Sequence, residues 1–188
     1  CRQTGFAMLC ETNPQEVMDL SPVAHCAALE GKTPFINFFD GFRTSHEIQK
    51  IEKWDYEDLK DMCPMDAVES FRQHSLNPEK PAMRGSHENG DVFFQHREAC
   101  NSVYDALPAV VEKYMAKINE KLGTDYDLFN YYGAPDADRV IIAMGSICDV
   151  AEEVIDYLTK AGEKVGLVKV RLYRPWVSSA LLKVLPET

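Results

Sequence analysis

Hydrophobic and polar positions follow two different periods along the first forty residues of the chain. "FAML" (6–9) and "PFINFF" (34–39) are short apolar runs, whereas residues 14–31 space their apolar side chains at helical intervals. A six-residue apolar and aromatic run bounded by a proline and by Asp40-Gly41 is too short for a buried helix and favours a strand. Strand, helix and strand in this order predict a parallel sheet and an α/β fold.

The helix between these two runs has a recognisable start. Asn13 is a suitable cap, Pro14 suits the first helical position, and Glu16 stands three residues after the cap, as in a capping box. Val17, Leu20 and Ala24 lie on one predicted face. Pro22 interrupts this pattern, so we expect the helix to kink or restart there.

A second capping box, Thr44-x-x-Glu47, predicts a helix that carries Ile48 and Ile51 inward. Residues 52–75 are rich in acids and indicate a partly helical surface. Residues 75–90 hold prolines, glycines and other turn formers, and predict a long loop.

The second half of the chain repeats the α/β pattern. "LPAVVEKYMAKINEKLG" predicts a helix that stops at Gly123, and the aromatic-rich stretch over 124–137 indicates a linker. "RVIIAMGS", "ICDVAEEVIDYLTKAG" and "KVGLVKVRLY" then predict strand, helix and strand, a βαβ unit that should be right-handed. We therefore expect two domains, 1–128 and 129–188.

Composition narrows the classes of partner. The chain has 188 residues, of which 45% are hydrophobic and 27% charged, with a net charge of -10. This composition predicts a soluble globular protein with a sizeable core. An acidic surface works against a nucleic-acid backbone as partner, and no apolar run approaches the roughly 18 residues of a membrane helix. We expect neither nucleic acid nor membrane as partner.

The cysteines favour a reducing compartment. The six cysteines are Cys1, Cys10, Cys26, Cys63, Cys100 and Cys148. None of them forms a CxxC pair, and none has a His or another Cys at the spacing of a metal site. We expect reduced, mostly buried thiols of a cytosolic protein. The chain begins without methionine and ends just after a predicted helix start, so we also expect it to be a piece of a longer protein.

Several blocks of the chain, in order, resemble the pyruvate:ferredoxin (flavodoxin) oxidoreductases. The blocks are "CRQTGFAML", "TPFINFFDGFRTSHEIQKIE", "NPEKPAMRG", "FFQHREACN", "GAPDADRVIIAMGS" and "GEKVGLVKVRLYRPW". The resemblance implies that residues 1–128 are the C-terminal part of a thiamine-diphosphate (pyrimidine)-binding domain. It also implies that 129–188 begin core domain II, which is similar to the C-terminal domain of transketolases.

The same resemblance implies a reaction for the parent enzyme. Family members oxidise pyruvate with coenzyme A to acetyl-CoA and CO2, and reduce ferredoxin or flavodoxin, using thiamine diphosphate, Mg²⁺ and [4Fe–4S] clusters. The resemblance further implies a homodimer in the cytoplasm, or in a hydrogenosome-like organelle of a eukaryote. In the family pattern the residues that meet pyruvate and activate the cofactor lie before Cys1. The magnesium, diphosphate and cluster sites lie after Thr188. We therefore expect no catalytic residue, no metal and no cofactor bound by these residues alone, and no activity from the isolated piece.

The stretch "DGFRTSHE" is the main candidate for a functional site. Ligands of parallel α/β sheets bind beyond the carboxyl ends of strands, where this stretch falls. Its candidate residues for binding the cofactor or supporting its cleft are Asp40, Arg43, Thr44, Ser45 and His46. Arg43 suits a carboxylate or phosphate as a bidentate anchor. The alternative is structural: a turn at Asp40-Gly41, a capped helix, and Arg43 paired with a neighbouring acid.

Three further patterns carry weaker hypotheses. Gly145-Ser146 precedes a helix and suits an anion on free backbone amides, although one glycine is a weak signal. His87, His96 and Glu98 match no ligand spacing, and the acidic residues 52–61 suit a solvated helix face or a ferredoxin contact. The alternative to an enzyme fragment is a self-contained α/β binding or interaction module.

Overall fold

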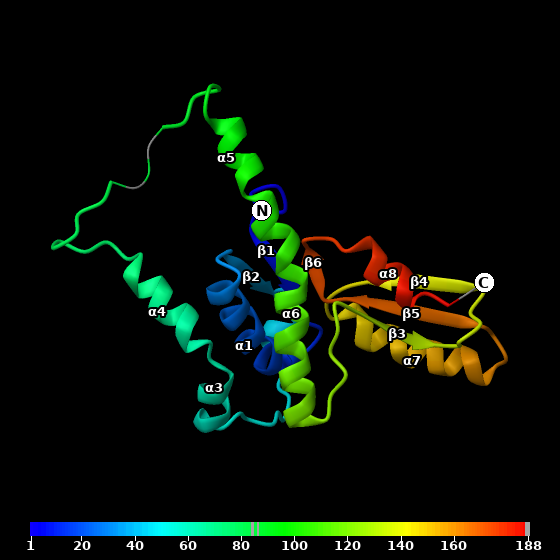
Figure 1. Ribbon diagram of the computed structural model, residues 1–188. Helices are drawn as coiled ribbons and strands as arrows, with labels where there is room; N and C mark the ends of the chain where they lie inside the picture. Colours follow the sequence, from blue (N-terminus) through cyan, green and yellow to red (C-terminus); the bar gives the residue numbers. More distant parts are fainter. Residues whose placement is uncertain (84, 86, 187–188) are drawn as a thin grey trace.

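The computed structural model describes residues 1–83, 85 and 87–186. It is an α/β structure with two three-stranded sheets, ordered β2-β1-β6 and β3-β5-β4 (Figure 1). The strands are β1 (Ala7–Cys10), β2 (Phe35–Phe38), β3 (Phe129–Gly133), β4 (Arg139–Ala143), β5 (Val165–Val170) and β6 (Leu172–Arg174). The helices are α1 (Pro14–Glu30), α2 (Arg43–His46), α3 (Tyr56–Met62), α4 (Met65–Gln73), α5 (Phe93–Ala99), α6 (Asn101–Leu122), α7 (Ile147–Lys160) and α8 (Ser178–Val184).

The first sheet confirms the predicted strand, helix and strand. β1 and β2 are parallel, with Ala7 opposite Phe35 and Cys10 opposite Phe38. On its other side β1 pairs with the antiparallel strand β6. The sequence did not predict β6, because three residues directly after β5 look like its continuation. The chain therefore returns to the first sheet after building the second.

Helix α1 begins as predicted, but Glu16 plays a different part. The Asn13 side chain accepts a hydrogen bond from the Glu16 N–H at 3.0 Å, so the cap is confirmed. The Glu16 carboxylate accepts from the Thr12 N–H at 2.8 Å, where a capping box has the cap residue itself. The expected restart at Pro22 is wrong, since the helix runs through it. Val23 and Ala27 beyond the proline are fully buried, and this packing holds the last turns in place.

The predicted helix after Thr44 is wrong. α2 is a single turn, and Glu47 already has an extended backbone with φ -71° and ψ 134°. Thr44 lies inside this single turn rather than at its cap, and its hydroxyl donates to Asp40 Oδ1 at 3.1 Å. Ile48, expected inside, is fully exposed, and Ile51 is half-buried.

Residues 65–100, which we call the arm, extend away from the rest of the chain (Figure 1). The arm consists of α4, a long connection and α5, and every described residue from 71 to 100 is exposed. The prediction of a loop over 75–90 is confirmed for the described residues, since 84 and 86 lie outside them. The acidic residues 52–61 are mostly exposed, as a solvated surface requires.

Helix α6 packs against α1 and supplies much of the core. It begins six residues before the predicted start and ends, as predicted, at Gly123, whose φ of 69° is left-handed. Its buried side chains from Val111 to Ile118 share one core with Leu9 of β1 and with Phe129 and Val168 of the second sheet. No helix in the described residues is long and apolar enough to cross a membrane.

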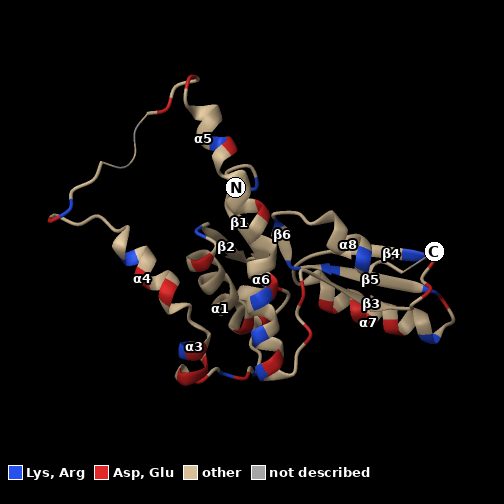
Figure 2. Ribbon diagram, in the orientation of Figure 1, with Lys and Arg blue, Asp and Glu red and all other residues tan. Residues whose placement is uncertain are grey.

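The second sheet confirms the βαβ unit, because β4 and β5 are parallel and α7 joins them. Acidic residues line much of α7 (Figure 2). The interpretation of 124–137 as a linker is wrong over 129–133, since these residues form β3, antiparallel to β5. Leu128 and Phe129 are buried, and this burial outweighs the turn-forming residues around them. The domain bounds 1–128 and 129–188 remain a prediction.

All six cysteines are free thiols. Cys10, Cys26 and Cys148 are buried, Cys63 is half-buried, and Cys1 and Cys100 are exposed. Half of the thiols are thus buried, fewer than expected. Burial raises the pKa of the Cys10 thiol to about 12, which keeps it protonated at neutral pH.

Candidate functional site

The turn after β2 contacts the start of α7, which is more than a hundred residues away in sequence. Asp40 Oδ1 accepts a hydrogen bond from the Ser146 N–H at 2.9 Å, and another from the Thr44 hydroxyl at 3.1 Å. The sequence predicted that an anion could bind at Gly145-Ser146, and the anion found there is the carboxylate of Asp40. A helix N-terminus favours negative charge, which stabilises this contact. The contact joins the turn after β2 to helix α7.

The environment of Asp40 favours its charged form. Partial burial works to raise the pKa of the carboxyl, but the hydrogen bonds from Ser146 and Thr44 outweigh it, and the pKa is lowered. Gly145 has a φ of 81°, which side chains rarely adopt, and a Cβ there would lie 3.4 Å from Asp40 Oδ1. Glycine is therefore favoured here by the left-handed backbone, since a Cβ at this distance from Asp40 would make only an ordinary contact.

Arg43 and His46 point to a different use of the same turn. Arg43 is exposed, and within the described residues its guanidinium makes no hydrogen bond or ion pair, so the expected structural pairing with an acid is not found. His46 Nδ1 lies 2.6 Å from the Phe42 carbonyl oxygen and 3.0 Å from Ser45 Oγ. The structure thus brings Asp40 and Thr44 together and leaves Arg43 projecting from the turn.

An open cleft of about 620 Å³ lies between this turn and α7. Its lining includes Thr12, Arg43, His46, Ser146 and Asp149. It lies beyond the carboxyl ends of β1 and β2, where parallel sheets bind ligands. Asp149 and the neighbouring Glu47 also line it, so its charge is mixed rather than uniformly positive.

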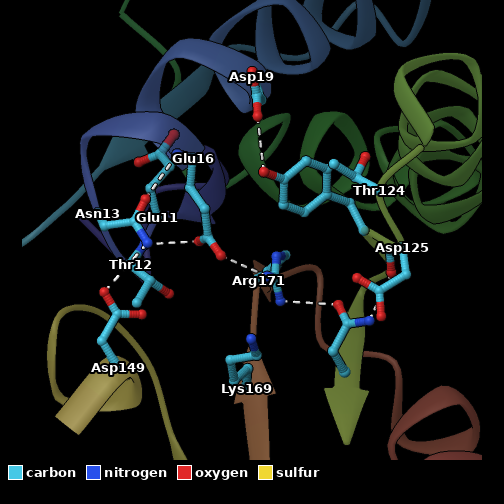
Figure 3. A network of polar contacts seen from close by, with 12 residues as sticks. Glu11, Thr12, Asn13, Glu16, Asp19, Thr124, Asp125, Asp149, Lys169 and Arg171 are labelled. Carbon is cyan, nitrogen blue, oxygen red and sulfur yellow. Dashed lines mark hydrogen bonds and ion pairs between the residues drawn. The ribbon is translucent and has the colours of Figure 1, made fainter. Parts of the chain in front are cut away.

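A buried ion pair joins helix α1 to the corner between β5 and β6 (Figure 3). Arg171, between β5 and β6, places Nη2 at 2.6 Å from Glu16 Oε1 of α1, and the two side chains are 3% and 8% exposed. Its Nη1 donates to Asn130 Oδ1 of β3 at 2.8 Å. One guanidinium therefore holds α1, β3 and the β5–β6 corner together.

Two more polar links join α1 and its cap to distant segments of the chain. The Asp19 carboxylate of α1 accepts from the Tyr126 hydroxyl at 2.8 Å and from Trp54 Nε1 at 3.2 Å. Burial, and then the Asp19 carboxylate, raise the pKa of Tyr126. Asn13 Nδ2 donates to Asp149 Oδ2 of α7 at 3.2 Å. We call this set, together with Glu16–Arg171 and Asp40–Ser146, the junction.

Most of the junction has no clear signal in the sequence. The pattern around Glu16 predicts only a helix cap, and no local pattern distinguishes Asp19. A signal for Arg171 exists, since it is a charge directly after the strand residues "VGLVKV". A charge within a buried run needs a partner, but the sequence does not say which acid supplies it.

The histidine, cysteine and acidic side chains of the described residues are spread out rather than gathered into a metal site. Among 1–83, 85 and 87–186 there is no group of three or more His, Cys, Asp or Glu side chains that could hold a metal ion. Of the weak metal candidates, His96 contacts Glu88 at 2.5 Å. The cleft beside Arg43 also carries two acids, which disfavour a diphosphate without its cation.

Comparisons with known proteins agree along the whole chain. Residues 1–116 match the family model described as pyruvate flavodoxin/ferredoxin oxidoreductase, thiamine diphosphate-binding. Residues 137–187 match the model for pyruvate:ferredoxin oxidoreductase core domain II. The two models stand in the order that the resemblance implied.

Relatives with this similarity are much longer than the chain. The pyruvate-flavodoxin oxidoreductase of Enterobacter agglomerans is 57% identical over 187 residues, which cover 100% of this chain and 16% of that protein. The pyruvate:ferredoxin oxidoreductase of Moorella thermoacetica is 55% identical over the same share of both chains. The chain thus spans about a sixth of the length of these relatives.

A solved structure shows the same fold. The 2-oxoglutarate:ferredoxin oxidoreductase from Magnetococcus marinus, with 2-oxoglutarate, coenzyme A and succinyl-CoA bound, matches with a TM-score of 0.52 at 18% identity. The match covers 95% of this chain and 32% of that one. At this identity it supports the α/β fold alone. The family models and the 57% identity nevertheless show the family: the chain belongs to the pyruvate:ferredoxin/flavodoxin oxidoreductases.

Proposed function

We propose that these 188 residues are part of an enzyme that oxidatively decarboxylates pyruvate with coenzyme A, giving acetyl-CoA and CO2 and reducing ferredoxin or flavodoxin. The observation that carries the proposal is the succession of two family models over residues 1–116 and 137–187, with relatives of that name at 57% and 55% identity. Thiamine diphosphate, Mg²⁺ and [4Fe–4S] clusters would supply the chemistry. We place their ligands in other parts of a cytoplasmic, dimeric enzyme.

Within that enzyme the described residues act as a scaffold. The junction ties the thiamine-diphosphate-binding part to the start of core domain II through Glu16–Arg171 and Asp40–Ser146, and Asp19–Tyr126 fixes the segment just before it. Catalytic groups held on rigid elements keep their geometry, and a misplacement of about 1 Å can cost on the order of 100-fold in rate. The junction therefore matters for turnover without touching substrate.

Arg43 has a separate part in this proposal. It projects from a turn whose backbone is held by Asp40, and it has no partner among the described residues. A guanidinium in this position suits a carboxylate or phosphate of the cofactor cleft, or of the remaining domains. Asp40, Thr44, Ser45 and His46 then support the turn from which Arg43 projects.

The test is Arg43→Lys in the full-length enzyme, loaded with thiamine diphosphate and clusters. Lysine keeps the charge but cannot make two parallel hydrogen bonds, so we expect turnover per folded molecule to fall by about 100-fold with little change in stability. Arg72→Lys, at an exposed position of α4, is the matched control and should leave turnover unchanged. Normal turnover in Arg43→Lys contradicts the role of Arg43. Absence of pyruvate oxidation in the unmodified enzyme contradicts the function itself.

A further inference from the structure

Glu11 is a fully buried carboxyl group that the junction does not use. It follows β1, its exposed fraction is 0%, and its backbone N–H donates to the Phe38 carbonyl at 3.0 Å. Neither carboxyl oxygen has a hydrogen-bond partner within the described residues. A bare carboxylate in such a place carries a large desolvation cost, so its state needs an explanation.

Asn37 on the neighbouring strand β2 also has a buried oxygen atom, Oδ1, without a hydrogen-bond partner among the described residues. The Ser21 hydroxyl donates to the Val17 carbonyl at 2.6 Å, so Ser21 Oγ has only lone pairs to offer and accepts from Asn37 Nδ2 at 3.0 Å. This chain of donors assigns the orientation of the amide and leaves Oδ1 as an acceptor in need of a donor.

The strand register puts the two side chains on one face of the sheet. Leu9 lies opposite Asn37 in the parallel pair of β1 and β2. Glu11 comes two residues after Leu9, and side chains two apart in a strand point the same way. The contact of Asn37 with Ser21 shows that this face is the one covered by α1.

We propose that Glu11 is held as a neutral carboxylic acid whose hydroxyl donates a hydrogen bond to Asn37 Oδ1. One proton then satisfies two of the three orphaned oxygen atoms, one on each residue. An ionised Glu11 would instead have at most the second N–H of Asn37 Nδ2 as a donor, and would leave Asn37 Oδ1 and one of its own oxygens without a partner. The proton completes a link from β1 through β2 to Ser21 of α1.

The surrounding charges agree with the neutral form. Burial is the largest cause that raises the pKa of Glu11, to about 8, and the Glu16 carboxylate of α1 raises it further, while Asn37 opposes the shift. Arg171, from the β5–β6 corner, is bound to Glu16. Asp40, beyond β2, is bound to Ser146 and Thr44, and the neighbouring Cys10 is a neutral thiol. No cation among these groups offsets a charge on Glu11.

The link depends on pH and lies close to the candidate turn, since Asn37 stands three residues before Asp40. A carboxyl whose folded pKa is raised gives stability that is complete below its unfolded pKa and is lost as pH rises through the folded pKa. The opening of β1 and β2 should therefore become easier from about pH 5 to about pH 8, by about tenfold per unit, and then level off.

The test is hydrogen exchange on the full-length protein, read on peptides that cover residues 7–12 and 35–39. After correction for the intrinsic rate, wild type should show the tenfold rise per pH unit and the plateau. Glu11→Gln, whose amide donates as the acid does, should match wild type near pH 5 and lose the pH dependence. Glu47→Gln, at an exposed position, should keep the wild-type profile.

Three outcomes overturn the proposal. A wild-type profile that is flat between about pH 5 and pH 8 does so by itself, even if Glu11→Gln fails to fold. If the opening constant of Glu11→Gln near pH 5 is about tenfold or more above that of the wild type, the fold stabilises the ionised form of Glu11. The third outcome concerns the salt. If β1 and β2 of the wild type open more slowly in NaCl or KCl than in a bulky organic salt of equal ionic strength, Glu11 is a carboxylate that binds a metal cation. The proposal does not depend on the enzyme's activity, so its failure leaves the proposed function untouched.

Discussion

The junction and the arm use polar and apolar side chains in opposite ways. The junction buries charged groups, with Glu16 and Arg171 at 8% and 3% exposure. The arm exposes apolar ones, with Phe71 at 65%, Leu76 at 71% and Phe94 at 69%. Hydrophobicity therefore does not decide which of the two regions is packed.

The difference lies in the partners that the fold supplies. Each junction residue meets a group from a distant segment, such as Glu16 and Arg171, which are separated by 155 positions. Within the arm, α4 contacts α1 and α5 contacts α6, while the connection between them has mainly local hydrogen bonds. Regions that lack long-range partners open easily, whatever their composition.

The largest expected effect comes from breaking the buried pair. Arg171→Met removes the partner of Glu16 and leaves a buried carboxylate, which should lower the free energy of unfolding by about 3–5 kcal/mol. Denaturant unfolding of the 188-residue chain measures this change. Adding Glu16→Gln should recover part of the loss, because the unpaired charge is then gone.

The matched control for Arg171 is an exposed pair. Arg139 and Glu163 lie 2.5 Å apart with side chains 71% and 50% exposed. Arg139→Met should change the free energy of unfolding by less than about 1 kcal/mol. Equal losses in Arg171→Met and Arg139→Met would show that burial does not distinguish the junction.

Limited proteolysis measures the contrast between arm and junction directly. Residues 75–90 should be cut at least about 100-fold faster than residues 124–137 in the 188-residue chain, since the arm is exposed and Tyr126, Leu128 and Phe129 are buried. Mass spectrometry of the first products locates the cuts. Early cleavage near 128 would instead support a flexible boundary between the two predicted domains.

The smallest effect is expected at the exposed rim of the junction. Asp40→Asn keeps the shape but removes the charge at the start of α7, which should cost about 1 kcal/mol. The lowered pKa of Asp40 gives stability that is present above the unfolded pKa and lost as pH falls through the folded one. The variant should therefore lose less stability on acidification than wild type.

Acid titration of unfolding checks this last prediction. Asp105→Asn, at an exposed position of α6, serves as the control and should follow wild type. A variant at Asp40 with the same acid limb as wild type would mean that the contact with Ser146 contributes nothing to stability.

Much of the local structure was predictable because its causes are local. The Asn13 cap, the strand at 35–38 and the stop at Gly123 depend on residues within a few positions of each other, and each of the three elements of the βαβ unit has its own local period. The helix after Thr44 failed for a reason of the same kind. Thr44 bonds back to Asp40, four residues earlier, and the backbone is already extended at Glu47.

The site was predictable only in part. The sequence placed Asp40 to His46 after a strand and an anion at Gly145-Ser146, but did not show that the two predictions describe one contact. The local pattern of β3 indicates a linker, because its partner strand β5 begins more than thirty residues later. Register between distant strands is fixed by packing, which a local pattern does not contain.

Residue identity and short spacing are enough to determine the family resemblance, the α/β class and the starts of α1 and α7. The tertiary structure alone decided which charges are buried and with whom: Glu16 with Arg171, Asp40 with Ser146, and Glu11 with no charged partner. A buried charge is stable only where the fold brings a complementary group within hydrogen-bond distance, and contacts between residues more than a hundred positions apart exist only once the chain has folded.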